Sequence, residues 1–376
     1  MSFDFKTIDS EAVSPGRTIL LRLDLNLPIV GGRVRDDFRL RRSLPTLEFL
    51  KTRGARTVIL SHIDNKETDS LKLVSEHLKK FVNLEFIQSL KELPERLLAL
   101  QPGEFLLLEN LRRNPGEIGN DPKFAQTLAS FGDIYINDAF SVSHRAHGSI
   151  VGIQKFLPSY AGFLFTEEVS HLSRAFNPPK PFVFVLAGAK FETKFPLVQK
   201  FIKLADSVFV GGALANDLFK TKGYEIGLSK HSGADFGFAE ILHNPKLVLP
   251  IDVVTENTGK KTTKMATAVL SDDTIFDAGP KTVAMLAEKF ASANFILWNG
   301  TLGAYENGFA EGTEALARAI VKSSAESIVG GGDTLACVSK LNILDEFSFV
   351  STGGGAMLEF LANETLPGIE ALKRSV

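Results

Sequence analysis

The chain has 376 residues, which is enough for two domains of about 150 residues each, and 44% of them are hydrophobic, as in a globular protein with a large core. A net charge of -2 argues against attraction of the whole molecule to nucleic acid or anionic membranes, and the single cysteine, Cys337, excludes an intramolecular disulfide. No apolar run approaches the roughly 18 residues of a membrane span, and the first residues lack the pattern of a signal peptide, so we expect a cytoplasmic protein.

Short β-rich runs alternate with helical patterns through the first half of the chain. Residues 18–23 (TILLRL) are predicted to form a buried strand, and residues 39–51 a helix. The alternation continues with strands at 57–61, 105–108 and 133–136 and with helices at 70–81 and 122–131. Continuous apolar strands between helices are typical of a parallel sheet that is covered on both faces.

A helix predicted over residues 163–176 ends at NPPKP (177–181), because proline cannot continue a helix. A second alternating series follows, with strands predicted within 181–188, 206–212, 294–300, 326–332 and 346–355. We therefore predict an α/β protein with two doubly wound parallel-sheet (Rossmann-like) domains joined by a helix. The cleft between the domains is the expected ligand site.

Three segments of the second half share the order strand, glycine run, helix: VFVGGALANDLF, SIVGGGDTLACVSKL and FVSTGGGAMLEFL. Glycine lets the backbone approach a ligand closely, and the helix start directs free N–H groups at it. One such turn could be only a tight connection, whereas three in one domain favour a phosphate or nucleotide site. Neither G-x-x-x-x-G-K-[ST] nor G-x-G-x-x-G is present in these contexts, which argues against a P-loop protein and a dinucleotide oxidoreductase.

Lys190 and Lys194 follow the strand at 181–188 with a spacing that places both on one helix face. They could be a solvated pair, but the preceding strand and small-residue turn favour a polyphosphate site. Asp333 follows Gly332 at a predicted helix start, where the position alone favours an N-cap role over that of a magnesium ligand.

Polar and basic residues follow the strand ends of the first half. Asp24 and Asn26 end the first strand, and the carboxyl ends of parallel strands lie on one edge of a sheet. The basic residues at these ends and at the first helix are Arg22, Arg39, Arg41, Arg42, His62, Arg112, His144, Arg145 and His147. Arginine binds phosphate and carboxylate through two parallel hydrogen bonds, so the cluster predicts a small, highly anionic substrate.

Ordered motifs over essentially the whole chain resemble those of the phosphoglycerate kinase family. They are RLDLNLP, DDFRLRRSLPTLEFL, ILSH, LLENLR, INDAFSVSHRAH, LAGAKFETK, GGALAN, DAGPKT, WNGTLGAYE, GGGDT and STGGGA. The resemblance implies reversible, Mg²⁺-dependent phosphoryl transfer from 1,3-bisphosphoglycerate to ADP, with closure of two domains about a hinge and with a monomeric state. It implies no nucleic-acid or membrane partner.

The resemblance also implies a domain plan. Residues 1–160 would bind 3-phosphoglycerate, residues 161–180 would form the linker helix and hinge, and residues 181–362 would bind ATP or ADP. Residues 363–376 would return to the first domain.

Matching motifs assign roles residue by residue. The implied substrate-binding residues are Arg22, Asp24, Asn26, Arg39, His62, Arg112 and Arg145. The implied nucleotide-binding residues are Lys190, Lys194, Gly211, Gly212, Asn299, Glu306, Gly331, Gly332, Asp333 and Thr334. Arg39, Lys190 and the helix start at Gly354 would act on the transferring phosphoryl group, and Asp333 would hold Mg²⁺.

The chain departs from the family pattern after the second strand. The family usually continues S-H-L-G-R-P, whereas this sequence has SHIDNK, with Asp64 for glycine and Asn65 for arginine. One basic contact is therefore lost and a carboxylate is added beside the predicted anion site. In WNGTLGAYE, Thr301 replaces the usual proline and Tyr305 the usual phenylalanine.

These departures leave an alternative open, a catalytically weakened nucleotide-binding protein with a scaffold or regulatory role. The retention of Arg39, Lys190, Lys194, Asp333 and the glycine-rich helix starts favours an active kinase.

Overall fold

The computed structural model describes residues 4–9, 12–189, 191–234 and 237–375. The chain divides into two compact units: residues 1–170 together with 365–376, and residues 171–364. Helix α6 (Phe163–Ser173) contains the first division between them and is followed by a 3-10 turn at Arg174–Phe176, where the sequence predicted one continuous helix. The second division lies just before the C-terminal helix.

The first unit is built on a six-stranded parallel sheet in the order β5-β6-β4-β1-β7-β8. Its strands are β1 (Thr18–Arg22), β4 (Arg56–Leu60), β5 (Leu84–Ile87), β6 (Phe105–Leu108), β7 (Ile134–Asn137) and β8 (Ser159–Ala161). Its helices are α1 (Phe38–Thr52), α2 (Lys72–Leu78), α3 (Leu93–Ala99), α4 (Pro115–Ile118), α5 (Pro122–Ala129) and α14 (Pro367–Lys373). A short hairpin, β2 (Ile29–Val30) and β3 (Arg33–Val34), follows β1.

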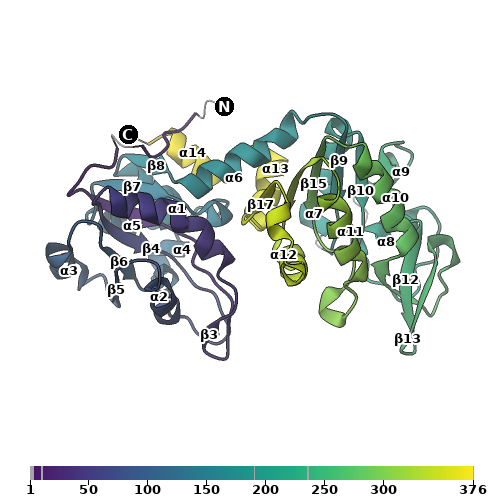
Figure 1. Ribbon diagram of the computed structural model, residues 1–376, viewed down its shortest axis with the longest axis horizontal. Coiled ribbons are helices and arrows are strands. Elements are labelled where there is room, and N and C mark those ends of the chain that lie inside the picture. Colours follow the sequence, from purple (N-terminus) through teal and green to yellow (C-terminus); the bar gives the residue numbers. More distant parts are fainter. Residues whose placement is uncertain (1–3, 10–11, 190, 235–236, 376) are drawn as a thin grey trace. The chain divides into compact units, whose positions relative to one another are not determined.

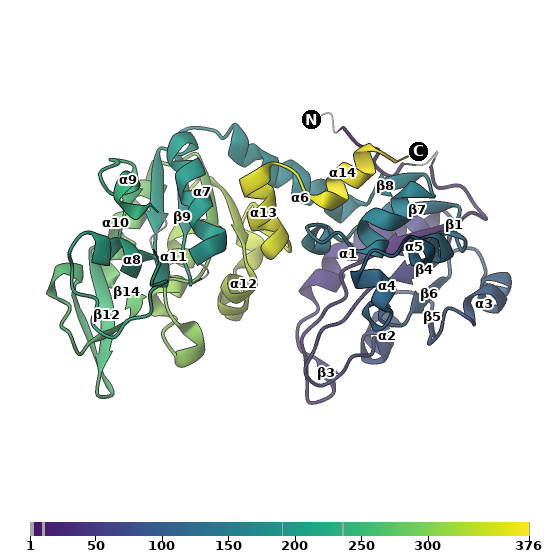
Figure 2. The same cartoon turned by 180° about the vertical axis from the view of Figure 1, so that it is seen from behind.

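Alternation along each strand divides the buried residues of this unit between two cores. Ile19 and Leu21 of β1 face a core that includes residues of α1 and α2, whereas Leu20 faces a core with α3 and α5. Figures 1 and 2 accordingly show α1 on one side of the sheet and α5 on the other. Because both faces are covered, the strands are mostly apolar, which is the pattern that predicted a parallel sheet.

The second unit repeats this plan with a parallel sheet in the order β11-β10-β9-β15-β16-β17. Its strands are β9 (Phe182–Leu186), β10 (Ser207–Val210), β11 (Leu247–Val248), β15 (Phe295–Asn299), β16 (Glu326–Gly330) and β17 (Phe349–Ser351). Its helices are α7 (Phe191–Leu204), α8 (Ala213–Thr221), α9 (Phe238–Leu242), α10 (Pro280–Ala291), α11 (Glu311–Val321), α12 (Gly332–Val338) and α13 (Gly355–Asn363). Helices α10 and α11 pack together, as do α7 and α13 (Figures 1 and 2).

A second, antiparallel sheet in this unit was not predicted. It consists of β12 (Asp252–Asn257) between β13 (Lys260–Met265) and β14 (Thr274–Ala278), and it packs with α8 around a small core. Among the described helices, none is both long and apolar enough to cross a membrane.

Candidate active site

The carboxyl ends of β1, β4, β6 and β7 bring polar side chains to one edge of the first sheet. The parallel register pairs Arg22 at the end of β1 with Leu60 of β4 and with Asn137 of β7. Arg22, Asp24, Arg112 and His147 all lie close enough to His62 to affect its pKa electrostatically. The structure therefore gathers most of the predicted substrate residues at this edge.

Asp24 is the acidic centre of this cluster. Its Oδ2 lies 3.0 Å from Nη1 of Arg39, in the first turn of α1, and also accepts a hydrogen bond from Ser141 Oγ. Its Oδ1 accepts the N–H of Asn26 at 3.1 Å. Burial favours the neutral acid, but Arg39 and these hydrogen bonds outweigh it and hold the pKa of Asp24 below its ordinary value. Asp24 therefore fixes Arg39 as a charged pair.

Arg22 and His62 are the buried members of this cluster. The Arg22 side chain is fully buried and donates to Ser149 Oγ at 2.9 Å, to the carbonyl of Leu23, and to Nδ1 of His62 at 3.3 Å. Burial, together with the charge of Arg22, lowers the pKa of His62 to about 3. His62 is therefore neutral. The Arg22 side chain hydrogen-bonds to protein groups and is not exposed at the surface of the site.

Arg112 and Arg145 are more accessible than Arg22 and His62. Arg112 belongs to the 3-10 turn Leu111–Arg113 after β6, and its Nη1 lies 3.5 Å from Oδ2 of Asp64. Arg145 is exposed after β7, next to the half-buried His144. Burial and then the charge of Arg145 lower the pKa of His144 to about 4, so this histidine is also neutral.

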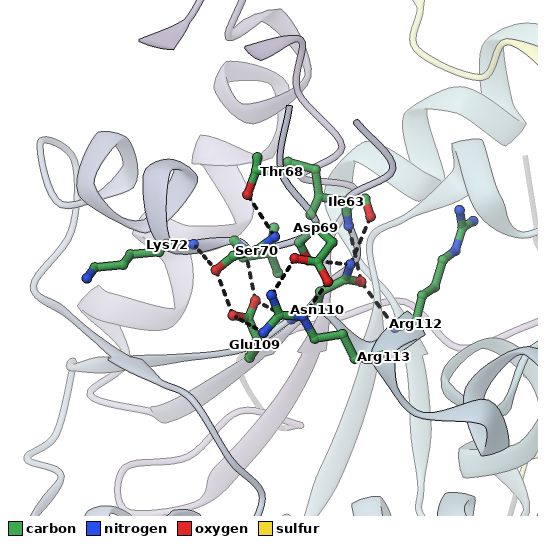
Figure 3. A network of polar contacts seen from close by, with 10 residues as sticks. Ile63, Thr68, Asp69, Ser70, Lys72, Glu109, Asn110, Arg112 and Arg113 are labelled. Atoms are coloured by element: carbon green, nitrogen blue, oxygen red, sulfur yellow. Dashed lines mark hydrogen bonds and ion pairs between the residues drawn. The ribbon is translucent and has the colours of Figure 1, made fainter. Parts of the chain in front are cut away.

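Figure 3 shows a polar network that supports Arg112 and that the sequence did not predict. The Asn110 side chain accepts the N–H groups of Ile63 and Arg112 and donates to the carbonyls of Ile63 and Asp69. The Glu109 carboxylate accepts from Ser70, Leu71, Asn110 and Arg113, and Arg113 also pairs with Asp69. The network fixes the backbone of Arg112 to the loop after β4. The Arg112 side chain extends away from the network.

The same loop carries the departure from the family pattern. Asn65 donates from Nδ2 to the carbonyl of Ile29 at 3.3 Å, and Glu67 accepts the N–H groups of Gly31 and Gly32. Asn65 and Glu67 therefore dock the β2–β3 hairpin. Asp64 bonds through its N–H to Asn26 Oδ1 at 2.9 Å, and its carboxylate is directed to Arg112.

The second unit contains a pocket of about 360 Å³ at the carboxyl edge of its sheet. Apolar residues such as Phe219, Val253 and Leu302 line it together with glycine turns. Of the predicted nucleotide residues, Gly212, Glu306 and Asp333 line this pocket. An apolar slot with a few polar groups at a strand edge is typical of a small-molecule site.

Glycine is required where two turns meet at this pocket. Gly212, between β10 and α8, has φ of 63° and ψ of -155°, a conformation that essentially only glycine adopts. A Cβ at this position would lie 2.5 Å from the backbone N of Gly188, which follows β9. Gly211 and Gly212 therefore allow α8 to begin against the neighbouring turn.

Several other predicted residues hold the turns together. Thr334 is buried and its Oγ1 accepts the N–H of Gly300 at 2.9 Å, and Asn299 donates to the carbonyl of Gly330 at 3.0 Å. Gly331 has φ of 109°, and a Cβ there would meet both Asn299 and Thr334. Lys194 is buried in α7, and its Nζ donates to the carbonyl of Ala187. Lys190 lies outside the described residues.

The helix start after β17 has free space around its backbone. Gly354 has φ of 52°, and nothing lies within 4 Å of a Cβ built on it. Gly332 likewise has open space and begins α12.

Asp333 suits a magnesium ion that receives most of its ligands from a bound nucleotide and from water. Its side chain is exposed in the first turn of α12, on the wall of the pocket. Among the described residues, no three acidic, histidine or cysteine side chains gather into a closed metal site. Mg²⁺ usually takes one or two carboxylates and completes its shell with phosphate oxygens and water, and a single exposed carboxylate fits that arrangement.

Comparison with known proteins shows which family has this architecture. A family model described as phosphoglycerate kinase matches residues 10–364. The chain belongs to the phosphoglycerate kinase family. Relatives of that name include one from Orientia tsutsugamushi (strain Ikeda), 39% identical over 98% of this chain and 97% of the relative. Another, from Coxiella burnetii, is 40% identical over 95% of both chains.

Solved structures agree with the sequence comparison. The phosphoglycerate kinase from Coxiella burnetii superposes with a TM-score of 0.84 over 98% of both chains, at 40% identity. That from Pyrococcus horikoshii OT3 gives 0.85 at 30% identity, over 97% of this chain and 98% of the other. The resemblance, the fold class and the enzyme class predicted from sequence are thereby confirmed: the chain is a glycolytic kinase that transfers phosphate to the carboxyl group of 3-phosphoglycerate.

Proposed function

We propose that the two sheet edges bind the two substrates of a reversible, direct in-line phosphoryl transfer, 1,3-bisphosphoglycerate and ADP in one direction and 3-phosphoglycerate and ATP in the other. The observation that carries the proposal is the gathering of Arg39, His62 and Arg112 at one sheet edge. A separate apolar pocket with glycine turns lies in the other unit. One edge suits a small anion and the other a nucleotide.

In the first unit, the cations neutralise the substrate and the polar groups orient it. Arg39, Arg112 and Arg145 supply fixed positive charge for a phosphate and a carboxylate. Asp24 and Asn26 hold the glycerate hydroxyl and carboxylate region, and Arg39 reaches the transferring phosphoryl group. An acyl phosphate donor and a carboxylate acceptor need little help from a strong base, so catalysis depends on positioning and charge neutralisation and no covalent nucleophile is needed.

In the second unit, the pocket receives the base and ribose, and the helix starts receive the phosphates. Glu306 hydrogen-bonds the ribose, and the apolar wall of the pocket packs against the base. We assign the phosphates to Lys194 and to the turns at Gly212 and Gly332. Lys190 and the N–H groups at the Gly354 helix start stabilise the phosphoryl group during transfer.

Asp333 would hold the Mg²⁺ that accompanies the nucleotide. A bound Mg²⁺ supplies charge neutralisation for the β- and γ-phosphates. The protein's own part is to present one carboxylate oxygen at the start of α12 and to leave the remaining positions to the nucleotide and water.

Two substrates held by separate units must be brought together before transfer, and water must be excluded from the transferring group. We therefore propose that residues 161–180 act as the hinge. We further propose that the enzyme is monomeric and cytoplasmic.

The role of Lys190 gives a direct test. Lys190→Ala should lower kcat by a factor on the order of 10² or more, because it removes charge stabilisation that develops in transfer, while ADP binding measured by calorimetry persists. An equal loss of turnover and of nucleotide affinity would contradict the assigned role.

A further inference from the structure

A buried chain of hydrogen bonds runs from the first helix after β6 to His62. Glu117 of α4 is fully buried, and its carboxylate accepts the Ser149 N–H at 2.8 Å and the Ser149 hydroxyl at 2.6 Å. Ser149 Oγ in turn accepts Nε of Arg22 at 2.9 Å, and Nη2 of Arg22 lies 3.3 Å from Nδ1 of His62. The sequence assigned roles to Arg22 and His62 but none to Glu117 or Ser149.

The direction of every hydrogen bond in this chain is fixed by its two ends. A carboxylate only accepts, so the Ser149 hydroxyl donates to Glu117 and offers its lone pairs to Arg22. A guanidinium only donates, so Nδ1 of His62 must accept from Arg22. In a neutral imidazole whose Nδ1 accepts, the proton is on Nε2.

We infer that Glu117 and Ser149 are positioning residues that lock His62, through Arg22, as the neutral tautomer with its proton on Nε2. His62 then offers an anionic substrate a fixed N–H donor and takes up no proton of its own in the working pH range. The role assigned to the substrate rests on the proposed function, but the tautomer itself does not.

The surrounding charges support a neutral ring. Three basic groups disfavour protonation of His62: Arg22 of β1, Arg112 of the turn after β6, and His147 of the loop before Gly148–Gly152. Asp24 alone among these neighbours favours it. Protonation of Nδ1 would direct the N–H of a cationic His62 at an N–H of the cationic Arg22. This repulsion would be costly, because His62 is buried, with only 2% of it exposed. Glu117 compensates the buried charge of Arg22 across Ser149, and its Oε1 is 4.0 Å from Nδ1 of His147.

The test is a two-bond ¹H–¹⁵N correlation spectrum of the full-length, histidine-labelled protein without ligand, with His62 assigned by comparison with His62→Gln. We expect the pattern of an Nε2–H tautomer that does not change between about pH 5.5 and 8. An Nδ1–H pattern, or a titration midpoint near the ordinary value of about 6.5, would overturn the inference. Neither result depends on catalysis, so an inactive enzyme with the expected spectrum would contradict the proposed function alone.

Ser149→Ala tests whether the chain sets the tautomer, with Ser130→Ala, an exposed serine at the end of α5, as the matched control. We expect Ser149→Ala to shift the His62 signals toward exchanging tautomers and to raise the KM for 3-phosphoglycerate on the order of fivefold, with the KM for ATP unchanged. The control should change none of these. Unaltered His62 signals in folded Ser149→Ala protein would show that the chain does not position His62.

Discussion

Asp64 places a carboxylate beside a residue that the proposed function needs for substrate. Its Oδ2 lies 3.5 Å from Arg112, and its side chain is 80% exposed. A substrate anion must displace this pair. Exposed ion pairs contribute about 0.2–1 kcal/mol, so the competing carboxylate weakens substrate binding only moderately.

Asp64→Asn should therefore lower the KM for 3-phosphoglycerate by up to about fivefold, with little change in kcat. The hydrogen bond from the backbone N–H of residue 64 to Asn26 Oδ1 does not involve the substituted side chain and is retained in the variant. The control is Glu85→Gln, which breaks a comparable surface pair with Arg96 on another part of the same unit. A KM that rises, or that changes no more than in the control, would contradict the competition.

Residue types at strand ends could be predicted from the sequence, but their partners could not. Asp24 and His62 stand directly after apolar strands, and the register of a parallel sheet brings such positions together. Glu109 directly after β6 and Glu117 in the four-residue helix α4 are buried acids in segments too short for any periodicity to distinguish them from surface residues. The bond from Asn65 to Ile29 depends on how a hairpin packs, which local sequence does not determine.

At the scale of elements, the βα turns of the second unit determine whether a nucleotide can be bound. Gly212→Ala would force a Cβ to within 2.5 Å of Gly188 N and would close the turn against the pocket. We expect ADP affinity, measured by calorimetry, to fall at least about tenfold.

Gly223→Ala is the matched control, because Gly223 also has a positive φ, 79°, but has nothing within 4 Å of a Cβ. Gly223→Ala shows what a positive φ alone costs an alanine, roughly 1–2 kcal/mol, and only Gly212→Ala should impair binding. Equal affinities in the two variants would argue that the turn at Gly212 does not contact the nucleotide.

The element pattern was predictable where strands are long and apolar. β9 and β15 are continuous apolar runs, and each is followed by a polar or glycine-rich turn. The sheet of β12, β13 and β14 was missed because β13 is almost wholly exposed and rich in lysine and threonine. Such a strand is specified by pairing with its neighbours rather than by burial.

For the molecule as a whole, buried Asp138 makes stability depend on pH. It follows β7, accepts the N–H of Phe165 at 3.0 Å, and its Oδ2 makes no hydrogen bond with the described residues. Burial raises its pKa to about 6, so the folded state holds this proton more tightly than the unfolded chain does. Its contribution to stability is complete below about pH 4 and is lost as pH rises through 6.

Asp138→Asn should remove this loss, because an amide stays neutral at every pH. We expect the free energy of unfolding of the wild type to fall relative to the variant between about pH 4 and 6, by at most on the order of 3 kcal/mol. Urea unfolding followed by circular dichroism at several pH values measures the difference. Parallel pH profiles for the two proteins would show that Asp138 is ionised in the folded state.

Despite Asp64 and Asn65, we expect this chain to be an active kinase of its family. A coupled assay of the purified protein with 3-phosphoglycerate, ATP and Mg²⁺, with Asp333→Ala as the control, measures whether it is. We predict turnover that requires Mg²⁺ and that collapses in the control. No turnover, with nucleotide binding still measurable by calorimetry, would contradict this expectation and favour a weakened nucleotide-binding protein.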